Sequence, residues 1–343
     1  MEQTNNSNFA ETARRVSGAL VIPVAVAIIL LALCAAGGKT MISNQTALNN
    51  FITYTAIVMI TTMALSINLN SGRFDFSLGA MAILSAVIGA KLTYLVLAGG
   101  SGSAMMMLIV TLVAGILLGL ASGALYVLLR IPPIITSLGV TLIMEGVVYT
   151  ITGGKYIMTE VQNDSMAAFG GSWVGSTLII VAVLAVVIFL FDETQFGYRY
   201  RALREGQKVA AETGIREIPN ALACYAICGG LMGLVGFLEA VRDTNIEGGN
   251  LSFGSISIMF TAFLPMFIGS YIGRYINEKV GFLLAALCMS MLNSTFAAFA
   301  NEVSASTQSI INAVLLVVFL IYLNNENLIR GLLKPIRGKE AHR

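Results

Sequence analysis

Two acidic residues inside apolar stretches are the first candidates for chemistry in this chain. Glu145 lies near the middle of one stretch, and Glu239 lies late in another, three residues before Arg242. A charged side chain at this depth in a membrane costs several kcal/mol unless it is paired or faces water. Glu145 has no cation near it in sequence, so we expect it to face a polar path between helices. For Glu239, a local ion pair with Arg242 explains the residue equally well.

Uncharged polar side chains lie within or beside the same stretches. Amide and hydroxyl groups can pass a hydroxylated solute along without holding it tightly, but they can equally hydrogen-bond one helix to another. Asp75, two residues after Arg73, can also form a purely local pair at a helix start. The candidates for a solute path are Asn68, Asn70, Asp75, Ser77, Glu145, Glu239 and Asn293.

The sequence contains few residues that could form a catalytic or metal-binding site. The only histidine is His342, and the four cysteines, Cys34, Cys224, Cys228 and Cys288, all lie in apolar stretches. A histidine-assisted nucleophile and a zinc site are therefore not available. We expect the cysteines to be buried packing thiols. The sequence predicts no catalytic residues, no metal site and no cofactor.

A phosphate-binding loop is missing as well. A chain that hydrolysed ATP itself would need the pattern G-x-x-x-x-G-K-[ST], because backbone amides and the lysine surround the phosphates. Gly38-Lys39-Thr40 comes near to it, but position 33 is Leu rather than Gly. We therefore expect any ATP to be used by a partner subunit.

Apolar helices must position all of these residues. Of the 343 residues, 57% are hydrophobic and only 11% are charged, and the mean hydropathy is +0.82. Soluble proteins carry about a quarter charged residues, so the predicted fold class is an all-α polytopic membrane protein, with one transmembrane domain over 1–343. A bilayer core takes about 20 apolar residues as a helix. Ten segments qualify: 18–36, 47–67, 76–97, 104–129, 134–152, 175–191, 219–241, 255–272, 280–299 and 307–323.

The cations predict the orientation of these spans. Lys and Arg are enriched in cytoplasmic loops. If the N-terminus is cytoplasmic, only Lys39, Lys91, Lys155 and Arg242 of the 20 cations lie outside. Both termini are then expected inside, in a bacterial cytoplasmic (inner) membrane. The net charge of +2 and the absence of a basic stripe argue against a nucleic-acid partner.

A short internal echo accompanies this map. Residues 68–80 follow the second span and residues 245–255 follow the seventh, and in both an Asn and a Gly precede Ser-x-Gly. The echo matches Ser77-Leu-Gly79 with Ser252-Phe-Gly254. One segment is predicted inside and the other outside, as in an inverted-topology repeat that relates spans 2–5 to spans 7–10.

The longest polar segment between spans is 192–218, which we call the charged island. Its cations are Arg199, Arg201, Arg204, Lys208 and Arg216. They place the island in the cytoplasm between the sixth and seventh spans. A soluble partner would have to bind here.

Four sequence blocks occur in a fixed order: 70–79 (NSGRFDFSLG), 131–139 (IPPIITSLG), 197–215 (GYRYRALREGQKVAAETGI) and 229–239 (GGLMGLVGFLE). Together they resemble the permease subunits of ribose/galactose-type monosaccharide ABC importers, which are binding-protein-dependent inner-membrane components. The chain looks like a divergent member. Arg204-Glu205 and Gln207 stand where Gly-Gly-Asn is more usual, and 270–281 (SYIGRYINEKVG) replaces a glycine-rich stretch.

The resemblance implies both partners and a coupling site. The partners are cytoplasmic ATP-binding subunits, an extracytoplasmic solute-binding protein and a second permease copy, in a homo- or heterodimer surrounded by membrane lipid. The island would hold a coupling helix from about Glu205 to Thr213, with Val209 and Ala210 as apolar contacts and Arg204 and Lys208 on the rim. The coupling residues are Arg204, Glu205, Gln207, Lys208, Ala210, Ala211, Gly214 and Ile215.

The expected solute is a monosaccharide or another small hydroxylated molecule. Nucleosides, a furanose signal and branched-chain amino acids are alternatives for the same architecture. An ion-coupled secondary transporter would need coupling through a residue such as Glu145. A membrane enzyme based on Ser and Lys is the weakest alternative, because the lysines lie at span ends.

Overall fold

The computed structural model describes residues 2–98, 100, 102–158, 160–162 and 164–325. In this part of the chain the regular structure is helical, apart from one isolated antiparallel bridge between Ile157 and Ile246. The chain divides into one unit that ends at Ala298 and a second that begins at Phe299. The second unit contains a single helix, α14 (Ala305–Asn324).

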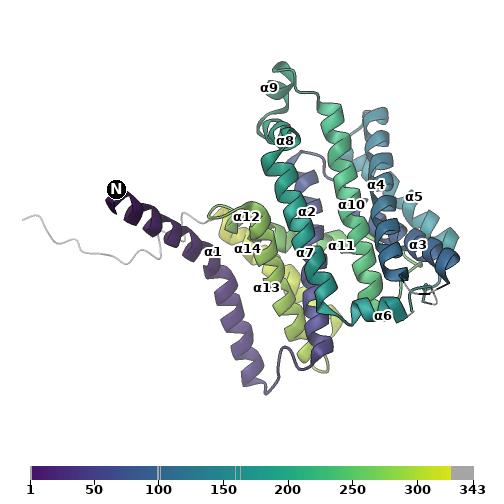
Figure 1. Ribbon diagram of the computed structural model, residues 1–343, viewed down its shortest axis with the longest axis horizontal. Helices are drawn as coiled ribbons and strands as arrows, with labels where there is room; N and C mark the ends of the chain where they lie inside the picture. Colours follow the sequence, from purple (N-terminus) through teal and green to yellow (C-terminus); the bar gives the residue numbers. More distant parts are fainter. Residues whose placement is uncertain (1, 99, 101, 159, 163, 326–343) are drawn as a thin grey trace, which may run out of the picture. The chain divides into compact units, whose positions relative to one another are not determined.

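The first unit contains all the other helices (Figure 1). In chain order they are α1 (Glu2–Ala36), α2 (Gln45–Asn70), α3 (Leu78–Leu97), α4 (Ser103–Leu129), α5 (Pro133–Thr152), α6 (Asp164–Gly170), α7 (Trp173–Ile188), the π-helix η1 (Phe189–Glu193), α8 (Gln195–Glu205), α9 (Gln207–Glu212), α10 (Glu217–Asp243), α11 (Ile256–Phe260), α12 (Phe263–Ile272) and α13 (Glu278–Ala298).

Nine helices in the described residues are long and apolar enough to cross a membrane. They match nine of the ten expected spans to within a few residues. The eighth expected span, 255–272, is helical but broken into α11 and α12 around Thr261. The all-α polytopic class is therefore confirmed, and one span is built from two short helices.

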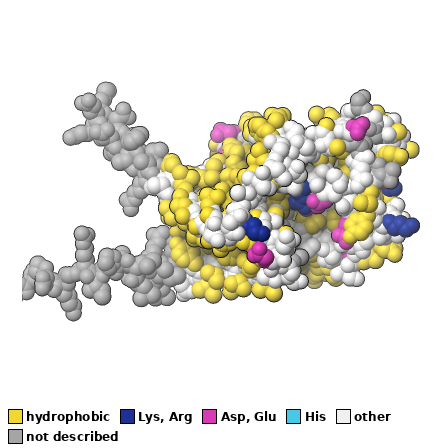
Figure 2. Space-filling model, turned by 90° about the horizontal axis from the view of Figure 1, so that it is seen from below, with side chains coloured by type: hydrophobic (Ala, Val, Ile, Leu, Met, Phe, Trp, Pro, Cys, Tyr) yellow, Lys and Arg dark blue, Asp and Glu magenta, His cyan; other side chains and the backbone are white. Residues whose placement is uncertain are grey.

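The α2 helix is the most buried of the spanning helices, and α1 of the first unit is the most exposed. Exposed Leu, Val and Ile side chains recur along α1, α4, α5 and α7. On the face that Figure 2 shows, hydrophobic side chains cover much of the coloured surface and charged side chains lie in small groups. Apolar side chains on the outside of a helical bundle are what contact with lipid acyl chains requires.

Helices α4 and α10 approach so closely that their contact accepts only glycine. A side chain on Gly115 would meet the backbone carbonyl of Gly229, and one on Gly233 would meet the backbone of Thr111. Lipid tails are as apolar as leucine, so membrane helices gain more from close backbone packing than from greasy side chains. The small residues of the 229–239 block thus position α10 against α4.

The loops meet at two opposite ends of the first unit. At one end Arg73 pairs with Glu217 at 3.2 Å, and Lys279 pairs with Asp192 at 2.7 Å. At the other end Ile157 bridges Ile246 through paired backbone hydrogen bonds. Figure 1 shows α8 and α9 at one end and α6 at the other. This is the alternation of loops that the cation count predicts.

Candidate functional site

The charged island folds as two helices with a break between them. Helix α8 ends at Glu205, and α9 runs only from Gln207 to Glu212. The coupling helix expected from about Glu205 to Thr213 is therefore shorter at both ends. Gly206 separates the two helices with extended backbone (φ 177°, ψ 103°), which interrupts the helical turn.

The end of α9 explains why a glycine is found at position 214. Gly214 has φ of +85°, in the left-handed region that favours glycine. Around it, the Thr213 amide donates to the Val209 carbonyl (3.2 Å) and the Ile215 amide donates to the Ala210 carbonyl (3.1 Å). A left-handed glycine after the last turn is a common helix ending. Gly214 and the half-buried Ile215 thus fix the shape of the island rather than its contact surface.

Only part of the expected coupling surface is presented outward. Val209 is 67% exposed, whereas Ala210 is 4% exposed. Ala210 is thus not available as the external apolar contact that the sequence predicts, because it packs inside the island. Glu205 is exposed. Gln207, Lys208 and Ala211 belong to α9, but their side chains lie outside the described part of the structure.

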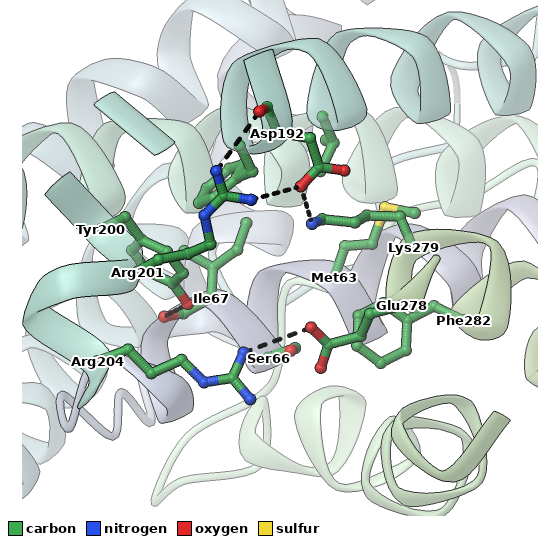
Figure 3. A pocket seen from close by; sticks show the side chains of 12 residues that line it. Met63, Ser66, Ile67, Asp192, Tyr200, Arg201, Arg204, Glu278, Lys279 and Phe282 are labelled. Atoms are coloured by element: carbon green, nitrogen blue, oxygen red, sulfur yellow. Dashed lines mark hydrogen bonds and ion pairs between the residues drawn. The ribbon is translucent and has the colours of Figure 1, made fainter. Parts of the chain in front are cut away.

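An ion-pair network fastens the base of the island to the start of α13, around a cavity of about 110 Å³ (Figure 3). Asp192, at the end of the α7 span, accepts from Lys279 (2.7 Å) and from the side-chain amide of Asn277 (2.7 Å). It also lies 3.7 Å from Arg201. Helix α8 is therefore held against two other parts of the first unit by charged groups.

Tyr200 anchors α8 to a third element, the central helix α2. Its hydroxyl donates to the Ile67 carbonyl at 3.0 Å, and its ring stacks edge-on against Phe191 with centroids 4.9 Å apart. Burial is the main cause that raises the pKa of the Tyr200 hydroxyl, which therefore stays protonated as the donor. A displacement of α8 would thus strain or break its hydrogen bond to α2.

Arg204 connects two sequence segments that both depart from the family pattern. Its guanidinium pairs with Glu278 at 3.4 Å, with side chains 39% and 25% exposed. Such a partly exposed pair contributes only about 0–1 kcal/mol. Arg204, which the sequence predicts on the rim of the docking surface, is thus exposed and also paired within the chain. The unusual residues of the island and of 270–281 fit one another.

Four of the predicted pathway residues lie around the segment between α2 and α3, residues 71–77, which we call the first hinge. Asp75 Oδ1 accepts from the Ser77 amide (2.8 Å) and the Ser77 hydroxyl (2.6 Å). Asn68 donates to the other Asp75 oxygen (3.5 Å) and accepts from the Cys228 thiol (3.3 Å). Asn70 donates to Ser66 Oγ nearby (3.0 Å). Asn68, Asp75 and Ser77 are all fully buried.

Glu145 holds the segment between α10 and α11, residues 244–255, which we call the second hinge. One carboxylate oxygen accepts from the Ser255 amide (2.9 Å) and hydroxyl (2.6 Å), and the other accepts from the Phe253 amide (2.9 Å). Glu145 is 2% exposed. Backbone and hydroxyl donors thus satisfy both oxygens of this membrane-buried side chain without a cation.

The second hinge contacts the first turn of α3 at Gly79, directly after the first hinge. A side chain there would overlap the backbone carbonyl of Ser255. The contact brings Asp75, Ser77 and Glu145 into one region of the bundle. Ser255 was missed as a functional residue, although a serine directly before an apolar run is a recognisable helix-start signal.

The other two predicted pathway residues lie elsewhere. Glu239 is half-buried on α10 and interacts with the Arg242 charge, while Arg242 gives its hydrogen bonds to Asp243 at 2.7 and 2.8 Å. Asn293 is exposed on α13. Sequence reasoning also missed Arg73, whose side chain is 1% exposed and pairs with Glu217 at the start of α10. The sequence suggested a local pair of Arg73 with Asp75, but the ion pair of Arg73 is with Glu217, 144 residues away.

Comparison with known proteins identifies the family. The model of the family described as "Branched-chain amino acid transport system / permease component" matches residues 47–322. The chain belongs to this permease family. The expected resemblance to importer permeases is thereby confirmed, and the chain is a multi-pass protein of the cytoplasmic membrane.

Individual relatives are distant. The autoinducer 2 import system permease protein LsrC of Photorhabdus laumondii is 26% identical over 247 residues, covering 69% of this chain and 70% of the relative. The galactofuranose transporter permease protein YtfT of Escherichia coli K12 is 25% identical over 234 residues, covering 68% of this chain. The match spans 66% of YtfT, just under two thirds of its length. No solved structure matches the chain.

Proposed function

We propose that this chain is the membrane-spanning permease subunit of an ATP-driven importer for a small hydrophilic solute. ATP is hydrolysed by separate cytoplasmic ATP-binding subunits that dock on α8 and α9. The observation that carries the proposal is the charged island: in a member of a permease family, it is a folded structure at the cation-rich end, braced against the spans and presenting Val209 outward.

The geometry supports transmission of force from the island into the bundle. Its base is joined to α13 through Glu278 and Lys279 and to α2 through Tyr200. A short helix with an exposed apolar residue fits the groove-docking mode of recognition. Movement of a docked ATP-binding subunit would then shift α8, and with it the ends of two spanning helices.

The proposed solute is a monosaccharide or a similarly hydroxylated molecule, delivered by an extracytoplasmic solute-binding protein at the end that carries α6. The names of LsrC and YtfT support this class, since they refer to autoinducer 2 and galactofuranose. The family description supports branched-chain amino acids as a second candidate. A second permease copy would complete the transporter.

Co-purification with an ATP-binding subunit tests the proposal. Affinity-tagged chain from its native membrane should retain a stoichiometric ATPase, and Val209→Glu should release it because a charge enters the apolar contact. Tyr156→Glu is the matched control: Tyr156 is also exposed, at 60%, but lies at the opposite end beside Ile157. Solute uptake that continues after deletion of the ATPase would overturn the proposal in favour of ion-coupled transport.

A further inference from the structure

The second hinge exposes non-helical backbone at membrane depth. Residues 251–254 are all exposed, and Leu251 and Phe253 are 45% and 38% exposed. Glu145, which binds the Phe253 and Ser255 amides, lies seven residues before the end of α5 at Thr152. At 1.5 Å per residue this is about 10 Å below the end of that spanning helix.

Backbone of this kind does not face lipid. In the hydrocarbon region every amide and carbonyl needs a partner, so irregular backbone occurs there only where it is buried in protein or lines a water-filled cavity. The exposed side chains around it include the hydroxyl groups of Ser252, Ser257 and Thr261. This face is therefore chemically different from the apolar outer faces of α1, α4, α5 and α7.

A row of phenylalanine rings continues this face. Phe76 and Phe260 have ring centroids 6.4 Å apart, Phe260 and Phe263 are 5.5 Å apart, and Phe263 and Phe267 are 6.4 Å apart. Phe260 is 54% exposed, and the other three rings are half-buried. The row begins at the first hinge and runs along α11 and α12.

The backbone at the second hinge is also strained. Ser252 and Phe253 have φ of +57° and +71°, and left-handed backbone costs a residue other than glycine about 1–2 kcal/mol. Three hydrogen bonds to Glu145 hold this conformation in place. Strain that the surroundings enforce in this way clusters at ligand-binding and switching regions of proteins.

From these observations we propose that residues 251–254, Ser257 and the row Phe76, Phe260, Phe263 and Phe267 form the wall of the aqueous solute pathway. The exposed backbone and hydroxyl groups contact the polar edge of the solute, and the rings contact its apolar face. A ring-shaped polyol such as a sugar has both: its hydroxyl edge can hydrogen-bond, and its C–H face can pack against the apolar face of an aromatic side chain. This inference rests on the proposed function, and it assigns the pathway to residues other than the buried polar groups predicted from sequence.

Thiol labelling of the full-length protein in membranes tests the wall without knowledge of the solute. Single substitutions Ser252→Cys and Ser257→Cys are treated with a charged, membrane-impermeant methanethiosulfonate reagent. Ile143→Cys is the matched control, because Ile143 is 63% exposed on α5 and lies two residues from Glu145, at the same depth. The four native cysteines are buried, so the background should be low.

We expect both serine positions to be labelled at least tenfold faster than Ile143→Cys. Equally slow labelling at all three positions would overturn the aqueous wall. Absence of labelling at Ser252→Cys combined with an oxidative cross-link between two copies would also overturn it, since the face would then be an interface between protein chains.

Uptake measurements test the aromatic part. With D-galactose as the probe, Phe260→Leu should lower the initial uptake rate at least tenfold, while Phe260→Tyr retains most of it. Equal rates for Phe260→Leu and the wild type would refute the ring contact, and uptake of L-leucine but not D-galactose would refute the solute class. Failure of the proposed function is distinguishable, because ATPase co-purification would be lost whatever the labelling pattern.

Discussion

The two hinges are alike in their hydrogen bonds but differ in what holds them. In the first hinge Asp75 accepts from the amide and hydroxyl of Ser77 at 2.8 and 2.6 Å. In the second hinge Glu145 accepts from the amide and hydroxyl of Ser255 at 2.9 and 2.6 Å. The first carboxylate lies two residues from its serine, and the second lies 110 residues away.

The first carboxylate therefore makes hydrogen bonds within one segment, and the second makes hydrogen bonds across the bundle. The bonds of the first hinge join two residues of the same segment and need no other helix. The hydrogen bonds of the second hinge need α5 beside it, because their acceptor belongs to that helix. We therefore expect Glu145 to connect the position of α5 with the conformation of the second hinge, and Asp75 to stabilise one helix start.

Removing Glu145 should have the largest effect. Glu145→Ala leaves the buried Ser255 amide and hydroxyl and the partly buried Phe253 amide without their acceptor, and each buried group costs about 1–3 kcal/mol. We expect a loss of at least about 3 kcal/mol in the free energy of unfolding. Thermal unfolding of the purified protein in detergent measures the loss, and uptake should be abolished.

Glu145→Gln is the matched control, because it keeps one acceptor oxygen and the size of the side chain. It should lose uptake while retaining more stability than Glu145→Ala. A Glu145→Gln protein with wild-type uptake would return Glu145 to a purely structural role. Wild-type stability in Glu145→Ala would contradict the connection across the bundle altogether.

Disturbing the contact between the start of α3 and the second hinge should have the next largest effect. Gly79→Val would push a side chain into the Ser255 carbonyl, and overpacking of this kind costs about 1–3 kcal/mol. We expect a destabilisation of about 2 kcal/mol and a loss of transport that exceeds the loss of folded protein. Gly139→Val is the control, since a side chain there meets nothing within 4 Å. Equal behaviour of the two variants would show that the hinges are independent.

Removing Asp75 should lower the free energy of unfolding by less than removing Glu145. Asp75→Ala leaves the buried Ser77 amide and hydroxyl without their acceptor, at about 1–3 kcal/mol for each group, but the segment can rearrange locally because donor and acceptor both belong to it. Ser77→Ala removes only the hydroxyl partner and should cost less than Asp75→Ala. Thermal unfolding measures both. An effect of Asp75→Ala as large as that of Glu145→Ala would remove the distinction between the two hinges.

The same comparison shows how far the sequence predicts this structure. Spans were predictable because an apolar run of about 20 residues has few alternatives in a membrane. For Asp75 the sequence correctly suggested a local interaction but offered Arg73 as the partner, whereas the hydrogen bonds come from Ser77. The partner of Glu145 was not predictable, because no pattern in α5 points to a residue 110 positions away. The prediction that Ala210 faces outward was wrong for a related reason. Which side of a six-residue helix faces outward depends on its tertiary packing.

A weaker connection joins α3 to the second hinge at the outer end of the bundle, through the loop between α5 and α6. Glu160 pairs with Lys91 of α3, and the loop that contains Glu160 bridges the second hinge through Ile157 and Ile246. Burial is the largest single influence on the pKa of Glu160 and raises it, but hydrogen bonds and the Lys91 charge together outweigh it and lower the pKa below 4.5. The pair is partly exposed, so its contribution should be below about 1 kcal/mol.

The sign of its pH dependence follows from this direction. A carboxylate whose pKa is lower in the folded protein contributes its full stabilisation above pH 4.5, and the contribution is lost as pH falls through the folded-state pKa. Thermal unfolding of Glu160→Gln should therefore differ from the wild type at pH 6 by less than about 1 kcal/mol and converge with it at lower pH. A difference that persists under acidic conditions would mean that the outer connection depends on packing around Glu160 and not on its charge.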